Sequence, residues 1–166
     1  MPNWAEGTLK VRGSKENIIN FLKNELLGGT YPVFRKGDDG RPTIEHKHKE
    51  ITHSQTDYDF TVECDGGFYI NGTRRAFIDI KKVCFDFYDE DIEMFEIEGF
   101  KQAWAVIPDN YTHLSKKYHL DFKIFAFEMG MEFTQEIEII KGQITKCIEH
   151  EYDNYFWEVP FARMGG

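Results

Sequence analysis

The pattern of hydrophobic and polar residues predicts that the chain opens with a strand followed by a helix. In residues 7–13 (GTLKVRG), Leu9 and Val11 alternate with basic residues, as is typical of a half-buried strand. Residues 15–27 (KENIINFLKNELL) instead place apolar side chains four positions apart, which predicts an amphipathic helix. Ser14 stands where the N-cap of that helix belongs, and a glycine pair ends the apolar pattern.

The rest of the chain predicts further strands around a second helix. Asn71-Gly72 stands between two strand-forming runs and is the strongest hairpin signal. After it, residues 107–119 (IPDNYTHLSKKYH) predict a short helix with Asp109 as N-cap. The apolar face of this helix would hold Tyr111, Leu114 and Tyr118.

The last third of the chain predicts two or three strands and an aromatic tail. Turns are expected near Met129-Gly130 and at Lys141-Gly142. The tail YFWEVPF, residues 155–161, is expected to be extended and to pair or dock.

This order of elements predicts an α+β, ferredoxin-like fold. The expected architecture is a mostly antiparallel sheet with two helices on one face and extra strands. Residues 1–166 would form a single domain, with a polar insertion at about residues 35–60 in which DDGRP marks a loop. A chain of 166 residues with 41% hydrophobic and 16% aromatic residues can bury a core without disulfides or metals.

The net charge of −9 is unevenly distributed along the chain. Residues 1–50 carry 9 bases and 7 acids, whereas residues 51–166 carry 11 bases and 22 acids. Such a balance disfavours direct nucleic-acid binding, which requires a basic footprint, and favours a basic protein as partner. Acidity that serves only solubility is the alternative.

Three cysteines, Cys64, Cys84 and Cys147, have no CxxC spacing and are expected to be reduced thiols. The N-terminus lacks the apolar region of a secretion signal, and no apolar stretch is long enough to span a membrane. We therefore expect a cytoplasmic protein that makes no contact with a membrane.

Residues 85–100 (FDFYDEDIEMFEIEGF) combine seven carboxylates with apolar side chains and contain no basic residue. In an extended segment, alternate carboxylates would point the same way about 6.6 Å apart, so that a rigid row could imitate a phosphate backbone. A solvent-facing amphipathic segment without a partner is the alternative. The aromatic residues would anchor the segment to the protein's own core or to a partner. The predicted partner-binding residues are Asp86, Asp89, Asp91, Glu93, Glu96, Glu98, Glu149, Glu151, Asp153, Phe87 and Phe95.

No motif for catalysis or for a metal site stands out. His46, His48 and His53 form the densest group of potential ligands, but further ligands at defined spacing are missing and nearby lysines would repel a cation. A solvated loop is therefore favoured there. We expect no catalytic residue, no metal and no cofactor, although enzymatic activity stays open. RNA binding through sheet aromatics is disfavoured because the aromatic residues after Lys82 stand among acids.

Two stretches resemble the YubB ferredoxin-like family of phage- and plasmid-encoded proteins. The first is MPNW leading into a strand and a helix, and the second is FKQAWAVIPDNYTHLSKKYHLDFKIFAFEMGMEFTQEIEIIKGQI. Together they cover Met1–Leu27 and Phe100–Ile144. The family's usual cysteine after MPNW is Ala5 here, and its proline run is reduced to Pro108. The matching residues are Pro2, Asn3, Trp4, Trp104, Pro108, Leu114, Glu128, Gly130 and Phe133.

The resemblance implies a ferredoxin-like fold and an origin in a mobile element, but it implies no activity. Together with the acidic stretch, it predicts a non-enzymatic inhibitor that occupies a basic, nucleic-acid-handling surface of a host protein, as an anti-CRISPR protein would. The alternative is a small enzyme or nucleotide-binding protein that uses the sheet face near Trp104 and Glu128. A homo-oligomer is also compatible with the sequence.

Overall fold

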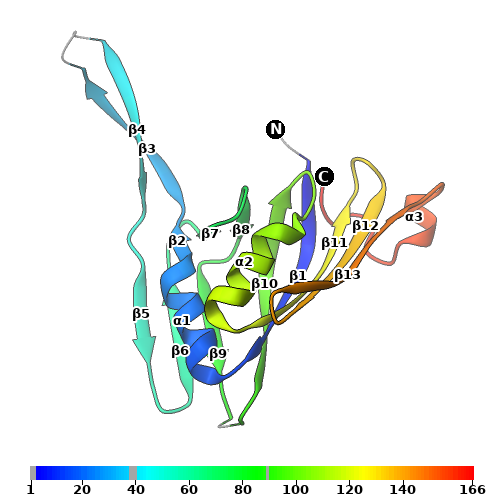
Figure 1. Cartoon of the computed structure of the whole chain (residues 1–166). Helices are drawn as coiled ribbons and strands as arrows, with labels where there is room; N and C mark the ends of the chain where they lie inside the picture. Colours follow the sequence, from blue (N-terminus) through cyan, green and yellow to red (C-terminus); the bar gives the residue numbers. More distant parts are fainter. Residues whose placement is uncertain (1–2, 38–40, 89) are drawn as a thin grey trace.

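A computed structural model describes residues 3–37, 41–88 and 90–166. In these residues, eight strands form one antiparallel sheet (Figure 1). Their order across the sheet is β13 (Gln143–Glu151), β12 (Phe133–Ile140), β11 (Asp121–Glu128), β1 (Trp4–Gly13), β10 (Glu93–Ala103), β8 (Ala76–Ile78), β7 (Phe68–Ile70) and β2 (Leu26–Gly28). The predicted α+β class with a mostly antiparallel sheet is confirmed, but the sheet is wider than a simple ferredoxin fold.

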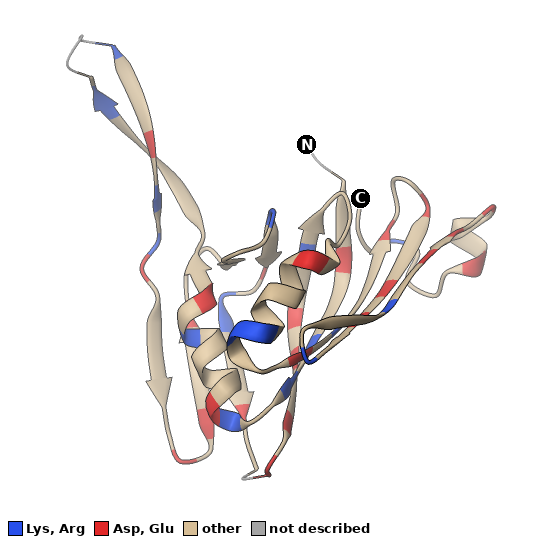
Figure 2. Cartoon of the chain, viewed as in Figure 1, with Lys and Arg blue, Asp and Glu red and all other residues tan. Residues whose placement is uncertain are grey.

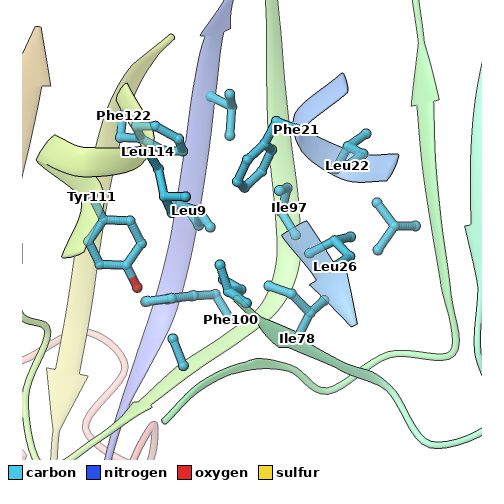
Figure 3. Packing of buried hydrophobic residues seen from close by; sticks show 14 of the residues in the cluster. Leu9, Phe21, Leu22, Leu26, Ile78, Ile97, Phe100, Tyr111, Leu114 and Phe122 are labelled. Atoms are coloured by element: carbon cyan, nitrogen blue, oxygen red, sulfur yellow. The ribbon is translucent and has the colours of Figure 1, made fainter. Parts of the chain in front are cut away.

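Both main helices, α1 (Lys15–Glu25) and α2 (Pro108–Tyr118), lie on the same face of this sheet (Figure 1). The predicted apolar positions are buried there, with Leu9 from β1 facing Phe21 of α1 and Tyr111 of α2 (Figure 3). Edge-to-face aromatic contacts add specificity, because Phe21 lies 5.5 Å from Phe122 of β11. The opposite face of the sheet carries neither main helix, and residues near the C-terminus cover part of it at Phe127.

Two helical crossovers interleave in the main sheet. Successive antiparallel pairings give β1 and β2 the same direction, and α1 connects them across β10, β8 and β7. Likewise β10 and β11 are both antiparallel to β1 and are connected by α2 across it. Both crossovers therefore place their helix on the same face of the sheet. The central strand β1 has a hydrogen-bonded neighbour on each side, β10 and β11.

Residues 30–48 form a β-hairpin that projects from the body (Figure 1). Its strands β3 (Thr30–Lys36) and β4 (Pro42–His48) pair with each other, and nearly all of their described residues are exposed. The solvated loop expected around His46 and His48 is a wrong prediction, because both residues lie in strand β4. The DDG positions of the other predicted loop, DDGRP, are residues 38–40 and lie outside the described residues.

The remaining strands form a second sheet in the order β5 (Thr52–Gln55), β6 (Asp59–Glu63) and β9 (Lys82–Asp86). Phe60 and Val62 of β6 face Phe85 and Val83 of β9, and all four side chains belong to the main core. This sheet therefore extends the core beyond α1 instead of forming a separate unit.

The helix ends differ in part from the prediction. Ser14 caps α1 as predicted, since its hydroxyl accepts a hydrogen bond from the Asn17 amide (3.3 Å). The helix stops at Glu25, however, because Leu26 already pairs with β7. Asp109 is not the N-cap of α2: Pro108 occupies the first helical turn, where its missing N–H costs nothing.

The aromatic tail is docked but not extended. Tyr155–Glu158 forms a short helix, α3, whose Tyr155 is buried against Phe127 and Val159. The Gly166 amide donates to the Trp4 carbonyl (2.9 Å), so the last residues lie against the first strand. Of the two alternatives expected for the tail, pairing or docking, the structure therefore confirms docking.

Glu25 connects α1 to α2. Its carboxylate accepts hydrogen bonds from the Lys117 ammonium and the Tyr118 hydroxyl, and only 2% of its residue surface is exposed. Burial acts to raise the pKa of Glu25, but these partners outweigh it and leave the pKa below the usual value of 4.5. The charged form of Glu25 therefore stabilises the fold.

We expect Glu25→Gln to lower the free energy of unfolding at neutral pH by about 1–2 kcal/mol, because a charge-assisted hydrogen bond is lost. A carboxylate with a lowered pKa stabilises the fold above its unfolded pKa and loses this contribution as pH falls through the folded pKa. The difference from the wild type should therefore shrink below about pH 4.5. Urea unfolding across pH measures it, with the exposed Glu16→Gln as control. A loss that does not depend on pH would contradict this role.

Candidate functional site

The acidic aromatic stretch connects the two sheets. β9 ends at Asp86 in the second sheet, and β10 begins at Glu93 in the main sheet. The connection lies beside the turn between β5 and β6, at the lower end of the molecule in Figure 1. The Phe87 amide donates to the Tyr58 carbonyl (3.0 Å), which holds the two segments together.

Carboxylates gather at this end of the molecule (Figure 2). Asp59 and Asp86 face each other directly across β6 and β9, which is an unfavourable arrangement of like charges. Asp57 lies in the adjoining turn, and Glu90 and Asp91 follow in the connection to β10. In the described part of the chain none of the five forms an ion pair. We call these five residues the acidic end.

Large apolar side chains are exposed beside these carboxylates. Tyr58 is 76% exposed and Tyr88 is 79% exposed, and Ile92 next to Asp91 is also exposed. The Thr56 hydroxyl accepts from the Asp59 and Tyr58 amides (both 3.1 Å), so the turn that carries Tyr58 is held by its own hydrogen bonds. The acidic end thus combines negative charge with exposed aromatic surface.

The structure corrects the predicted row of Asp89, Asp91 and Glu93. Glu93 is only 4% exposed and its carboxylate accepts from the amides of Tyr88 (2.8 Å) and Glu90 (3.2 Å). Glu93 therefore binds the backbone of the connection between β9 and β10 and does not face a partner, whereas Asp91 is exposed. Asp89 lies outside the described residues.

The aromatic anchors point into the protein's own core. Phe87 is buried, with its ring 5.5 Å from Phe85 and covered by the Lys15 ammonium at 4.8 Å. Phe95 is half-buried and packs 5.1 Å from the same Phe85 ring. Of the two alternatives that the sequence left open for these rings, the structure therefore selects anchoring to the core.

Glu96 and Glu98 are exposed on β10, but they do not form a regular row. Glu96 pairs with Lys10 of β1 (3.0 Å), which neutralises it. Glu98 lies next to Gly99, whose φ of 69° accompanies a register shift between β1 and β10. The bulge interrupts the spacing of two residues on which a phosphate-like row would depend.

Glu149, Glu151 and Asp153 lie at the far edge of the main sheet, in β13 and the bend after it. Glu149 faces the helices, because Gln135 donates to it (3.1 Å) and also accepts from the Val106 amide just before α2. Glu96 instead faces the open side beside Lys10. The predicted carboxylates thus divide between different surfaces and cannot form one array.

The histidines are separated by the fold. His46 and His48 share a face of β4, as expected for alternate residues, and a ring nitrogen of His48 lies 2.7 Å from the Gly28 carbonyl. His53 stacks on Phe60 in the second sheet, where burial first and the charge of Lys23 second lower its pKa. Within residues 3–37, 41–88 and 90–166, no group of three potential ligands is placed to hold a metal ion.

A cluster of tryptophan and basic side chains lies at the opposite end of β1 and β10. The guanidinium carbons of Arg74 and Arg75 are 5.5 and 5.1 Å from the centroid of the Trp104 ring. Arg75 and the Lys101 ammonium also approach the Trp4 ring, at 5.9 and 5.2 Å. We call these five residues the tryptophan–arginine cluster. Sequence analysis singled out Trp4 and Trp104 but missed the arginines, whose only signal is the Arg-Arg pair after the hairpin turn.

Buried hydrogen bonds fix the backbone of this cluster. The Gln102 side chain is fully buried and donates to the Arg74 carbonyl (3.0 Å). The Asn110 side chain accepts from the Arg74 amide (3.0 Å), and the Trp104 amide donates to the Asn3 carbonyl (2.8 Å). The cluster therefore rests on a rigid polar support that joins the start of β1, the end of β10 and α2.

Glu128, the other residue of the alternative site, does not reach the open face. Its fully buried carboxylate accepts from the amides of Gly130 (2.9 Å) and Met131 (2.6 Å) and so forms the turn between β11 and β12. Burial first, and the charge of Glu128 second, raise the pKa of the neighbouring Tyr155 to about 12. Glu128 thus has a structural role.

No family model, curated protein or solved structure matches the chain. In the described residues no helix is both long and apolar enough to cross a membrane. What the chain does must therefore be argued from the acidic end and the tryptophan–arginine cluster themselves.

Proposed function

We propose that the chain is a non-enzymatic binding protein that docks its acidic end on a basic surface of a host protein. The observation that carries this proposal is the facing pair Asp59–Asp86, which lies among other carboxylates and forms no ion pair within the described residues. Such an arrangement costs folding stability and is compensated when a basic partner supplies the missing counter-charges. Tyr58 and Tyr88 would add aromatic contact area, which is enriched at the centre of protein interfaces.

The basic surface is proposed to be one that handles nucleic acid, such as the groove of a defence nuclease. The acidic end would compete there with phosphate groups, so the protein would act as an inhibitor in the cytoplasm of a host cell. The contacting set is smaller than the sequence predicted: it keeps Asp86 and Asp91, and adds Asp57, Asp59 and Glu90. Contacts between exposed charges weaken with salt, which gives the binding a recognisable signature.

Support for the ferredoxin-like fold comes from the interleaved crossovers β1–α1–β2 and β10–α2–β11, an arrangement compatible with the ferredoxin-like plan. In that interpretation the β3–β4 hairpin, the second sheet and the β7–β8 pair are additions between the two crossovers. Trp4 and Trp104, which carry part of the YubB resemblance, belong to one cluster. Membership of the family and the ferredoxin-like fold are part of the proposal.

The test compares two variants with the same change in net charge. One carries Asp86→Asn, Glu90→Gln and Asp91→Asn at the acidic end, and the other carries Glu149→Gln, Glu151→Gln and Asp153→Asn at the sheet edge. Purified CRISPR effector nucleases and other basic nucleic-acid-binding host proteins are assayed for DNA binding with each variant present. We expect the wild type and the sheet-edge variant to inhibit at least one of them, and the acidic-end variant to need at least about tenfold more protein.

The salt dependence provides a second readout for the same proteins. Inhibition by the wild type should weaken as the salt rises from about 50 to 300 mM, because the Debye length shortens. Equal losses in both variants would mean that net charge alone acts, and inhibition of none of the proteins would reject the proposal.

A further inference from the structure

We propose that the tryptophan–arginine cluster binds single-stranded nucleic acid, with a base stacked on Trp104 and phosphates held by Arg74 and Arg75. This site is separate from the acidic end, because Trp4 starts β1 and Trp104 follows β10, whereas the acidic end lies where β1 ends and β10 begins. The inference does not depend on the proposed inhibitor function.

The two arginines of this cluster carry charge that no ion pair of the described residues neutralises. In the described residues neither Arg74 nor Arg75 forms an ion pair, although acids outnumber bases in the chain by 29 to 20. Lys101 is paired with Asp79. Planar guanidinium groups with free donors match phosphate oxygens, so the arginines supply the electrostatic part of the site.

The aromatic part of the site is exposed. Trp104 remains 49% exposed even with two guanidinium groups near its ring. Trp4 and Phe77 meet edge to face at 5.7 Å, and Tyr69 lies 5.6 Å from Phe77, so a half-buried aromatic row continues across the open sheet face. Aromatic rings combined with arginines are the means by which proteins bind unpaired bases and their backbone.

The backbone of two residues in this cluster, Trp104 and Arg75, has a strained conformation. Trp104 has φ 64° and Arg75 has φ 55°, values that are uncommon for residues with a Cβ atom. Such strain persists only where the surroundings impose it, and it is concentrated at functional sites. Here the Arg74 carbonyl accepts from Gln102, the Arg74 amide donates to Asn110, and the Trp104 amide donates to Asn3, and these hydrogen bonds supply that constraint.

The overall acidity of the chain argued against nucleic acid as a ligand, but that argument considered the charge along the sequence and not its distribution over the folded surface. The acidic end lies at the other end of β10, so it does not frame these aromatic residues. A ligand at the cluster meets two unpaired guanidinium groups first. An exposed aromatic ring beside these arginines therefore fits a single strand more closely than a duplex, whose bases are stacked inside.

The test uses a labelled oligothymidylate of about ten nucleotides, a length within the range bound by small single-strand binding folds. At about 50 mM salt we expect saturable binding by fluorescence anisotropy, with log K falling against log salt at a slope of about −1.4 if both arginines contact phosphates. Arg74→Gln and Arg75→Gln should each weaken binding about three- to tenfold, whereas the exposed Lys23→Gln on α1 should not.

Trp104→Gly separates binding from folding. Glycine adopts a φ of 64° without strain, so this variant should unfold at the same temperature as the wild type or higher, yet bind at least about tenfold more weakly. Trp104→Phe should retain part of the affinity, and Trp157→Ala, which removes an exposed tryptophan from α3, should retain all of it.

Three outcomes would overturn the inference. Absence of oligothymidylate binding would do so, as would equal affinities of the wild type and Trp104→Gly. If thymidine monophosphate bound as tightly as the oligonucleotide, the site would be a mononucleotide pocket and not a surface for a strand.

Discussion

Replacing Gly7 by alanine should lower the free energy of unfolding by about 3 kcal/mol or more, one of the largest single-residue effects that we expect in this protein. Gly7 lies in the central strand β1, opposite Ala126 of β11 and Phe100 of β10. A Cβ atom at this position would collide with the Phe125 carbonyl oxygen and would lie 2.9 Å from the Ala126 Cα atom. These are backbone atoms, so no side-chain rotation relieves the collision and β1 must move away from β11.

The sign of this effect makes it informative. Where the backbone tolerates a Cβ atom, replacing glycine by alanine stabilises a protein by about 0.4–1 kcal/mol by restricting the unfolded chain. Urea unfolding of Gly7→Ala beside Thr8→Ala, which removes a half-exposed side chain from the same strand, distinguishes the two cases. The control should change stability by less than about 1 kcal/mol. A stabilised Gly7→Ala protein would mean that β1 and β11 are not as close as described.

Local sequence patterns were sufficient for the elements that build the core. The Ser14 cap, the buried Leu9 and Val11, and the apolar face of α2 follow from periodicity and capping chemistry, which act over a few residues. The turn at Lys141-Gly142 was equally predictable from the sequence. In the structure both residues have positive φ and connect β12 directly to β13.

The acidic stretch shows where local patterns fail. Alternation of charge placed Asp91 and Glu93 on one side of a strand, but the chain changes sheets between β9 and β10. At that change of sheet, the free amides of Tyr88 and Glu90 need an acceptor, and Glu93 turns inward to provide it. A buried carboxylate that satisfies loop amides has the same sequence signature as an exposed one, so only the tertiary fold distinguishes them.

The tryptophan–arginine cluster could not be predicted from the sequence for a different reason. Arg75 and Trp104 are distant in sequence and become neighbours because β8 pairs with the end of β10. No local pattern encodes that pairing, and the left-handed conformations that aim the two side chains are set by the polar support below them. The candidate site thus depends on Gln102, a residue that no sequence motif identifies.

Gln102→Leu should lower the free energy of unfolding by about 2–4 kcal/mol, because leucine fills the same space but satisfies none of the hydrogen bonds. The Gln102 carbonyl oxygen accepts from the Tyr111 hydroxyl (3.0 Å), and its amide donates to the Arg74 carbonyl (3.0 Å). Burial raises the pKa of Tyr111 well above its usual value of 10, so the hydroxyl keeps its proton and needs an acceptor. The loss should be measurable by urea unfolding.

A double-mutant cycle separates the unsatisfied groups from any packing defect. In Gln102→Leu/Tyr111→Phe the buried hydroxyl is gone together with its acceptor, so the double variant should be more stable than the sum of the single losses predicts, by about 1 kcal/mol or more. The Arg74 carbonyl stays without its partner in both backgrounds, and oligonucleotide binding should therefore stay weakened even where stability recovers. Strict additivity of the two changes would show that Gln102 and Tyr111 do not act together. Unaltered oligonucleotide binding would show that Gln102 does not support the tryptophan–arginine cluster.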